Sequence, residues 1–437
     1  MLSRLDLRGF TGDLATVVAR PEPGGAEPLA AVREIIADVR QRGDEALREL
    51  TARFDGVEID ELRVGKGDLS AALAGLDPAF REALEFAKAQ ITAYHRTQLE
   101  PGGLGGSPGE SETRHEREGI VIRTLARPVD RAGCYVPGGR AVYPSTVLMT
   151  AIPAQVAGVG EIALCVPPGP DGAVPAATLA AAALCGLDEV YRVGGAQAIA
   201  ALAYGTKSIA PVDVIVGPGN VYVSLAKREV AGVVGIESTA GPSELVVVAD
   251  ESAPPDYVAI DLMAQAEHGP HGAALLVTWS EPLAAAVEES MERLLAAATR
   301  RSDIEATLAT GGRVVLVEGP EQAMAVANVV APEHLQLMNT DPVALVPLVR
   351  HAGAVFCGLF APAPVGDYVA GVNHVLPTAR TARFSSALRV SSFMKHVQVV
   401  GLDETALARV APYVTAFAEV EGLEAHALSV RMRGART

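Results

Sequence analysis

The stretch that decides the fold class is EVYRVGGAQAIAALAYGTKSIAPVDVIVGPGNVYVSLAKREVAG, residues 189–232. It repeats one order: a short run rich in β-branched residues, a glycine-containing turn, and a run with apolar residues at helical spacing. This alternation is typical of strand-helix-strand units, in which helices cover the faces of a parallel sheet. The sequence therefore predicts an α/β fold.

The same alternation continues on both sides of this stretch. Upstream, the strand-like run at 161–169 precedes a helical run at 177–187. Downstream, strand-like and helical runs follow one another as LVVVAD, DYVAIDLMAQAEH, AALLVTW, PLAAAVEESMERLLAA, RVVLVEG, EQAMAVANVVA and AGAVFCGLF. We predict two Rossmann-like, doubly wound α/β domains of similar make-up, plus a small C-terminal extension.

The expected domains interleave along the chain. We place an N-terminal arm at residues 1–27 and a dimerisation tail at 389–437. A discontinuous first domain, 28–134 with 244–388, would hold the metal and catalytic residues, and a second domain, 135–243, would hold the cofactor segments. The tail is too short to bury a core alone, so we expect it to dock on a partner subunit. Amphipathic helices are expected within 28–54 and 78–99, and a flexible glycine-rich loop at 100–111.

Composition excludes several classes of protein. With 437 residues, 49% of them apolar, the chain has enough apolar sequence for more than one core. A formal net charge of −16 argues against a nucleic-acid partner. No apolar run is long enough for a membrane span or a signal core, so we expect a cytoplasmic protein. The four cysteines form no Cys-x-x-Cys pair and are expected to be buried small side chains.

Glycine-containing turns are the candidate cofactor segments. GVGEIA at 158–163 fits a dinucleotide fingerprint by letter, but a helical run precedes it and a strand follows, so we discount it. The glycines at 193–195 and 217–219 instead lie between a strand and a helix, where a backbone can approach a phosphate. Ordinary strand-to-helix turns are an equally good interpretation of these two segments alone.

Polar residues of the second half raise the question of a metal site. In DLMAQAEHGP, residues 261–270, Gln265 and His268 are three apart and share one helical face. A solvated helix end is the simpler interpretation of that segment. Further oxygen and nitrogen donors occur at Asp367, His374, Glu421 and His426. Together these donors would suit a borderline divalent ion such as zinc.

Glu333 and His334 are adjacent titratable residues in VVAPEHLQL. Such a pair suits general base catalysis, although a single histidine is more often structural. Only the joint occurrence of these residues with the other donors favours a catalytic interpretation.

A series of stretches, in chain order, resembles the motifs of the histidinol dehydrogenase family: YVPGGRAVYPSTVLMTAIPAQVAGV, VGGAQAIAALAYGT, VIVGPGNVYVSLAKREVAG, AGPSELVVVAD, DLMAQAEHGP, APEHL, GDYVAGVNHVLPT, ARFSSALRVSSFMK and EGLEAHALSV. The resemblance covers nearly the whole chain. It implies the NAD-linked, four-electron oxidation of L-histidinol to L-histidine through L-histidinaldehyde, which ends histidine biosynthesis. It also implies one zinc ion per subunit and a homodimer whose C-terminal regions cross over to complete the partner's site.

The resemblance also implies roles for individual residues. Zinc would be held by Gln265, His268, Asp367 and His426, and NAD by Tyr135, Gln197 and Asn220. Substrate contacts would come from Ser243, His374, Glu421, His334 and the zinc ligands. His334, with an imidazole pKa near neutrality, would accept the hydroxyl proton, and Glu333 would activate a water. Glu421 and His426 would be contributed in trans.

Some positions depart from the family's usual pattern, and other functions stay open. The departures are Thr150, Val214, His271 and Ala363, none of which carries an implied role. The alternatives are a relative that oxidises another small alcohol such as a sulfonated diol, a zinc hydrolase in which Glu333 activates water, and a non-catalytic metal-binding module.

Overall fold

The computed structural model describes residues 2–18, 26–99, 112–139, 141–238, 241–269 and 272–434. The predicted loop at 100–111 and His271 lie outside the described residues. The chain forms two compact units: unit 1 holds Met1–Arg96 and Asp130–Phe393, and unit 2 holds Thr97–Val129 and Met394–Thr437. Among the described residues, no helix is long and apolar enough to cross a membrane.

Unit 1 contains a six-stranded parallel sheet. Its strands lie in the order β1 (Ser3–Asp6), β11 (Gly312–Leu316), β10 (Ala273–Thr278), β9 (Glu244–Ala249), β12 (His334–Met338) and β13 (Ala354–Cys357). Apart from β1, this is a doubly wound order, because β9 comes first in sequence and lies at the centre beside β12.

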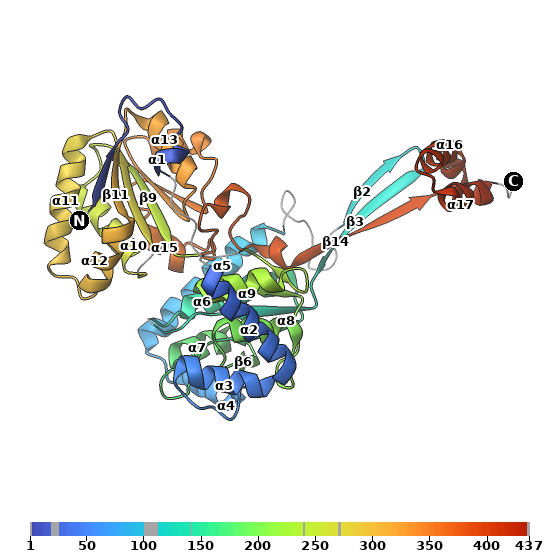
Figure 1. The fold of residues 1–437 in the computed structure, drawn as a ribbon, viewed down its shortest axis with the longest axis horizontal. Coiled ribbons are helices and arrows are strands. Elements are labelled where there is room, and N and C mark those ends of the chain that lie inside the picture. Colours follow the sequence, from blue (N-terminus) through green and yellow to red (C-terminus); the bar gives the residue numbers. More distant parts are fainter. Residues whose placement is uncertain are drawn as a thin grey trace. The chain divides into compact units, whose positions relative to one another are not determined.

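Helices cover both faces of this sheet, because its strands are apolar on both sides. Leu245 and Val247 pack against α10 (Pro255–Ala266), α11 (Glu281–Leu295) and α12 (Arg301–Gly311). Val246 and Val248 point the other way, towards α1 (Ala15–Val18), α13 (Pro320–Val330) and α14 (Pro342–Leu345). Figure 1 shows α10, α11 and α12 on one side of the sheet and α13 and α1 on the other.

A five-stranded parallel sheet, also in unit 1, repeats the doubly wound order. Its strands are β6 (Glu189–Tyr191), β5 (Glu161–Cys165), β4 (Arg131–Tyr135), β7 (Val214–Val216) and β8 (Gly235–Ile236). Over one face pack α2 (Ala26–Arg42), α3 (Asp44–Asp55), α8 (Gly195–Tyr204) and α9 (Val221–Val230). The helices α6 (Pro144–Ala157) and α7 (Ala176–Leu184) also belong to this part of the unit. The predicted fold class is confirmed by the two parallel sheets.

The predicted domain boundaries differ from the packing. Residues of α2 and α3 such as Val32, Ile36 and Leu47 are buried with the five-stranded sheet, whereas we had placed 28–134 with 244–388. The predicted N-terminal arm contains β1, which pairs with β11 at the edge of the six-stranded sheet. Helical periodicity identifies a buried face but not the sheet that receives it, and this explains the difference.

The helices before the five-stranded sheet also have different bounds from those expected. One run was expected at 28–54, but Gly43, with φ of 58°, separates α2 from α3. After α4 (Lys66–Ala74), the helix expected at 78–99 is α5 (Pro78–Thr97). Three cysteines are buried as expected, but Cys357 is exposed.

Unit 2 combines two segments that are distant in sequence. The antiparallel strands β2 (Glu112–Arg117), β3 (Ile120–Pro128) and β14 (Met394–Leu402) form its sheet, followed by α16 (Glu404–Val420) and α17 (Glu424–Gly434). The tail expected at 389–437 therefore pairs with a hairpin that we had assigned to the first domain. The hairpin was missed because β2, ETRHER, is polar and exposed throughout. Docking of this unit on a partner stays a prediction.

Candidate active site

Glu333 and His334 lie at the amino end of β12, in the interior of the protein. Because β12 pairs with β9, Glu333 reaches the first residue of β9, and its Oε2 accepts a hydrogen bond of 3.1 Å from the Glu244 N–H. His334 is only 4% exposed, and its Nδ1 lies 3.8 Å from the same Glu333 oxygen. The pair lies at the edge opposite to the carboxyl ends where open α/β sheets usually bind ligands.

Asp367 and His374 complete a cluster with this pair. Asp367 belongs to α15 (Ala363–Tyr368), and its Oδ1 lies 3.3 Å from Nε2 of His334. His374 Nδ1 lies 2.9 Å from the Asp367 carbonyl oxygen, which can only accept, so Nδ1 carries the proton. Its Nε2 then accepts a hydrogen bond of 3.1 Å from the Thr146 hydroxyl. We call Glu333, His334, Asp367 and His374 the acid-histidine cluster.

Charges within the cluster shift the pKa values of its members. Burial would raise the pKa of Asp367, but the neighbouring His334, His374 and His268 lower it overall. Burial would lower the pKa of His334, but Glu333 and Asp367 together raise it to about 9. Burial holds the pKa of His374 below its ordinary value despite Asp367. Without a cation beside them, two carboxylates therefore favour the imidazolium form of His334, and the near-neutral pKa expected for its catalytic role stays a prediction.

The end of α10 supplies two of the predicted metal ligands. Gln265 is 4% exposed, and its Nε2 is buried without a hydrogen-bond partner among the described residues. Such a group is unusual in a folded protein and is expected where a ligand completes the site. His268 lies just beyond the helix, and its Nδ1 donates to the Gln265 carbonyl over 3.2 Å. That contact orients the imidazole and leaves Nε2 available as a metal ligand.

The predicted zinc ligands fall in both units. Gln265, His268 and Asp367 belong to unit 1, and the influence of His268 on the pKa of Asp367 shows that these two are close. His426 lies on α17 of unit 2, where it is exposed. Within the described part of the chain, no three His, Cys, Asp or Glu side chains are grouped as a metal site. The amide, imidazole and carboxylate donors nevertheless suit zinc.

The remaining predicted substrate contacts are also divided between the units. Ser243 is half-buried directly before β9, and its carbonyl oxygen accepts a hydrogen bond from the Ala273 N–H at the start of β10. Ser243 therefore lies at the same amino edge of the six-stranded sheet as Glu333. Glu421 is exposed at the end of α16 in unit 2.

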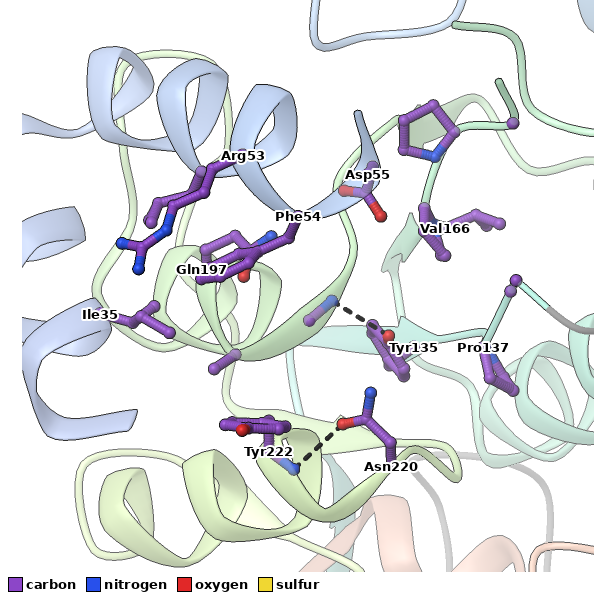
Figure 2. A pocket seen from close by; sticks show the side chains of 18 of the residues that line it. Ile35, Arg53, Phe54, Asp55, Tyr135, Pro137, Val166, Gln197, Asn220 and Tyr222 are labelled. Carbon is purple, nitrogen blue, oxygen red and sulfur yellow. Dashed lines mark hydrogen bonds between the residues drawn. The ribbon is translucent and has the colours of Figure 1, made fainter. Parts of the chain in front are cut away.

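The three residues predicted to bind NAD line one cavity of about 1000 Å³. Tyr135 ends β4, Gln197 lies in the first turn of α8, and Asn220 caps α9. The cavity thus lies at the switch point of the five-stranded sheet, where doubly wound folds bind ligands. Figure 2 shows two of its hydrogen bonds: the Gly195 N–H donates to the Tyr135 hydroxyl over 3.1 Å, and the Tyr222 N–H donates to Asn220 Oδ1 over 3.0 Å.

A second wall of this cavity was not foreseen from the sequence. Arg53, Phe54 and Asp55 at the end of α3 line the side opposite Asn220 and Tyr222 in Figure 2, and Glu34 of α2 also lines the cavity. They were missed because α2 and α3 look like ordinary amphipathic helices. The sequence did contain one signal. An acidic residue at the carboxyl end of a helix interacts unfavourably with the helix dipole, so the position of Asp55 indicates a role other than helix stability.

The beginning of α6 connects the cavity with the acid-histidine cluster. Val142, two residues before the first residue of α6, lines the cavity. Thr146, about one helical turn further on, donates to His374 over 3.1 Å. The two functional regions of unit 1 are therefore neighbours.

The departures from the family pattern leave these contacts unaffected. Thr150 is buried in α6 and donates over 2.7 Å to the carbonyl oxygen of Thr146. Val214 is buried in β7, and Ala363 is buried at the start of α15. These side chains are absent from the lining of the cavity as far as the described residues define it.

Two doubly wound sheets, with a nucleotide-sized cavity beside a cluster of carboxylates and histidines, define a class of α/β enzymes suited to dehydrogenation. Comparison with known proteins narrows this class. The sequence model of the family described as histidinol dehydrogenase matches residues 19–434. The chain belongs to the histidinol dehydrogenase family, whose members are oxidoreductases, and this membership implies histidinol oxidation in histidine biosynthesis.

Individual relatives support this membership. A histidinol dehydrogenase of Geobacillus kaustophilus is 50% identical over 412 residues, covering 94% of this chain and 95% of the relative. One from Synechococcus is 50% identical over 406 residues, covering 92% of each chain. The crystal structure of histidinol dehydrogenase from Elizabethkingia anophelis superposes with a TM-score of 0.92 at 33% identity, covering 99% of this chain and 98% of that chain.

Proposed function

We propose that this chain catalyses the zinc-dependent, NAD-linked, four-electron oxidation of L-histidinol to L-histidine through L-histidinaldehyde. The observation that carries the proposal is the start of α6, where Val142 lines the cavity and the Thr146 hydroxyl bonds to His374. A dinucleotide in the cavity and a substrate at the acid-histidine cluster would then lie on either side of the first turn of α6.

Zinc would be held in unit 1 by Gln265, His268 and Asp367. The buried Gln265 Nε2, which has no partner in the segments that the structure describes, and the oriented imidazole of His268 support this assignment. When bound, the cation would supply a positive charge that holds the substrate's amine and imidazole nitrogens and offsets the negative charge of Asp367. We propose His426 of α17, contributed by a second subunit, as the fourth ligand, with Glu421 as a substrate contact.

NAD would be held by Tyr135, Gln197 and Asn220, and when bound it supplies the hydride acceptor. Each of the two oxidations also releases a proton from oxygen. His334 Nε2 and a Glu333 carboxylate oxygen are the proposed acceptors. His334, held neutral when the bound cation offsets the charge of Asp367, takes the carbinol proton, and Glu333 takes a proton from the water that hydrates the aldehyde. Burial of both side chains keeps bulk water away from the aldehyde.

The enzyme is proposed to be a cytoplasmic homodimer. The exposed apolar side chains of α16 support association: Tyr413 is 69%, Phe417 is 72% and Val420 is 90% exposed in the single chain. A contiguous apolar surface of this kind marks an interaction site.

Turnover of L-histidinol with NAD tests the function. We expect two NADH per histidinol, followed by absorbance, and a loss of about 100-fold or more for Glu333→Gln, with unchanged thermal stability as the control. If histidinol yields no NADH while another small alcohol does, the chain is instead a related dehydrogenase that oxidises that alcohol. Cofactor-free hydrolysis of an amide or ester would select the zinc hydrolase instead.

A further inference from the structure

We propose that the carboxylate of Asp55 accepts hydrogen bonds from the neighbouring hydroxyl groups of a ribose of the bound dinucleotide. This inference rests on the proposed NAD-dependent function. It adds a cofactor contact from α3, outside the segments that carry Tyr135, Gln197 and Asn220. It also explains why an acidic side chain occupies a poor position for folding.

Asp55 lines the cavity and is incompletely satisfied by the protein. Its Oδ2 is closed off from solvent and has no hydrogen-bond partner among the described residues. Figure 2 shows the carboxylate pointing into the space above Tyr135. The Asp55 charge contributes, after burial, to a raised pKa of Tyr135, so the two side chains are close. A buried acceptor without a donor is costly, and a ligand that brings hydroxyl donors removes that cost.

The local fold gives no reason for a carboxylate at this position. Asp55 is the last residue of α3, and Gly56 follows in the left-handed conformation with φ of 71°. A negative charge in the last helical turn is disfavoured by about 0.3–1 kcal/mol. Burial adds a further cost by raising the pKa of Asp55 to about 6. Asp55 thus lowers the stability of the fold in two ways and lines a cavity, which indicates that its carboxylate is present to bind a ligand.

The chemistry of the cavity defines the group that Asp55 would bind. A carboxylate can only accept, so the ligand must provide donors. Among the described residues of the lining, the charged side chains are acidic at Glu34, Asp38 and Asp55 and basic at Arg53. This balance opposes a phosphate at the α2 and α3 wall, whereas the glycine turns at 138–139 and 194–195 on the other side suit the pyrophosphate. Two neighbouring ribose hydroxyls match the two oxygens of one carboxylate, as acidic residues do in other dinucleotide sites.

The test compares Asp55→Asn with a matched control, Glu58→Gln. Both changes remove one negative charge from the same segment, but Glu58 is exposed and lies outside the lining of the cavity, whereas Asp55 has the buried oxygen. We expect Asp55→Asn to raise the KM for NAD about tenfold, because the neutral amide no longer accepts charge-assisted hydrogen bonds. Its kcat at saturating NAD and its KM for histidinol should stay within about twofold of wild type, and Glu58→Gln should stay near wild type throughout.

Two further binding experiments identify which ribose of the dinucleotide Asp55 contacts. Calorimetric titration with ADP probes the adenosine ribose, and nicotinamide mononucleotide probes the other one. Weaker binding of either fragment to Asp55→Asn supports the proposal and names the ribose. A further comparison uses an NAD analogue that lacks the 2′-hydroxyl of that ribose. Wild type should bind the analogue more weakly than NAD, whereas Asp55→Asn should bind the analogue and NAD equally well.

The outcomes separate this inference from the proposed function. Unchanged affinity of Asp55→Asn for NAD and both fragments, while wild type oxidises histidinol with NAD, overturns the role of Asp55 alone. An equal loss in Glu58→Gln also overturns it, because a general charge effect then suffices. A wild-type protein that oxidises histidinol without NAD overturns both.

Discussion

Asp55 shows at the scale of one residue how function and folding compete. Its carboxylate lies at the negative end of α3 and carries a buried oxygen that has no donor within the described part of the chain. Burial raises its pKa from an ordinary value of 3.8 to about 6. The folded chain therefore holds this proton more tightly than the unfolded chain does. The contribution of Asp55 to stability is greatest below a pH of about 4 and falls as the pH rises to about 6.

Asp55→Asn should therefore stabilise the protein without NAD at neutral pH. We expect a higher Tm than wild type above about pH 7, and a difference that shrinks towards zero near about pH 3, where wild-type Asp55 is largely protonated in both states. Other charges on this wall are Glu34, Asp38 and Arg53. The exposed Glu58 lies outside the wall, so Glu58→Gln serves as the control and should not reproduce the pH dependence. A Tm difference that is the same at both pH values would contradict this account.

The family resemblance, carried by motifs at strand-to-helix turns, implied Tyr135, Gln197 and Asn220 as cofactor residues. All three line one cavity, and their role in binding NAD stays a prediction. Asp55 was not predicted, because nothing local shows that the end of α3 faces this cavity. The pKa of His334 was not predicted either, since it depends on Asp367, a carboxylate from a distant segment.

At the scale of elements, a buried ion pair holds the turn between β7 and α9. Lys227 Nζ donates to Glu237 Oε1 over 2.7 Å and to the Gly217 carbonyl over 3.1 Å, and the Gly217 N–H donates to the same Glu237 oxygen over 2.7 Å. The two charged side chains are 1% and 3% exposed. Gly217 has φ of 118°, and a Cβ there would lie 2.0 Å from the Tyr135 carbonyl oxygen. This turn leads directly to Asn220, so the pair supports the cofactor cavity.

Removal of one partner of this pair should destabilise the protein strongly. Lys227→Met leaves Glu237 buried without its counter-charge, which costs about 3–5 kcal/mol in unfolding free energy. The matched control is Lys66→Met, because Lys66 pairs with Asp188 over 2.8 Å while the two side chains are 70% and 68% exposed. That change should cost about 0–1 kcal/mol. Equal effects of the two substitutions in denaturant unfolding would contradict the role of the buried pair.

Elements with a continuous apolar pattern were predictable, and polar or edge elements were not. The central strands β9 and β10 are buried on every residue and were recognised as apolar runs. The strand β12, HLQLM, was overlooked because His334 and Gln336 interrupt its apolar pattern. The exposed strand β2 lacks an apolar face, and the short edge strand β1, SRLD, contributes a single apolar side chain, Leu5.

At the scale of the whole molecule, the proposed site needs residues from both units. Gln265, His268 and Asp367 belong to unit 1, whereas His426 and Glu421 belong to unit 2. The composition of the units could not be read from the sequence. Unit 2 joins a hairpin near residue 120 to the C-terminal segment through the pairing of β3 with β14, and such long-range pairing has no local signature.

Mixing two inactive variants tests whether subunits share sites. His334→Ala removes a unit 1 residue and His426→Ala a unit 2 residue. If each site takes unit 1 from one subunit and unit 2 from the other, a mixed dimer contains one intact site. We expect histidinol oxidation to return when the two proteins are unfolded and refolded together, but not when either is refolded alone. Persistent inactivity of the verified mixed dimer would show that each site is built from one chain.

The central claim is that the cavity of the five-stranded sheet and the acid-histidine cluster serve one reaction. The most direct measurement uses L-histidinol with deuterium on the carbinol carbon and analyses the reduced cofactor by mass spectrometry. Direct hydride transfer across the start of α6 predicts deuterium in the NADH, at one atom per aldehyde formed. Oxidation of histidinol that yields NADH without deuterium, or no NADH, would contradict the claim.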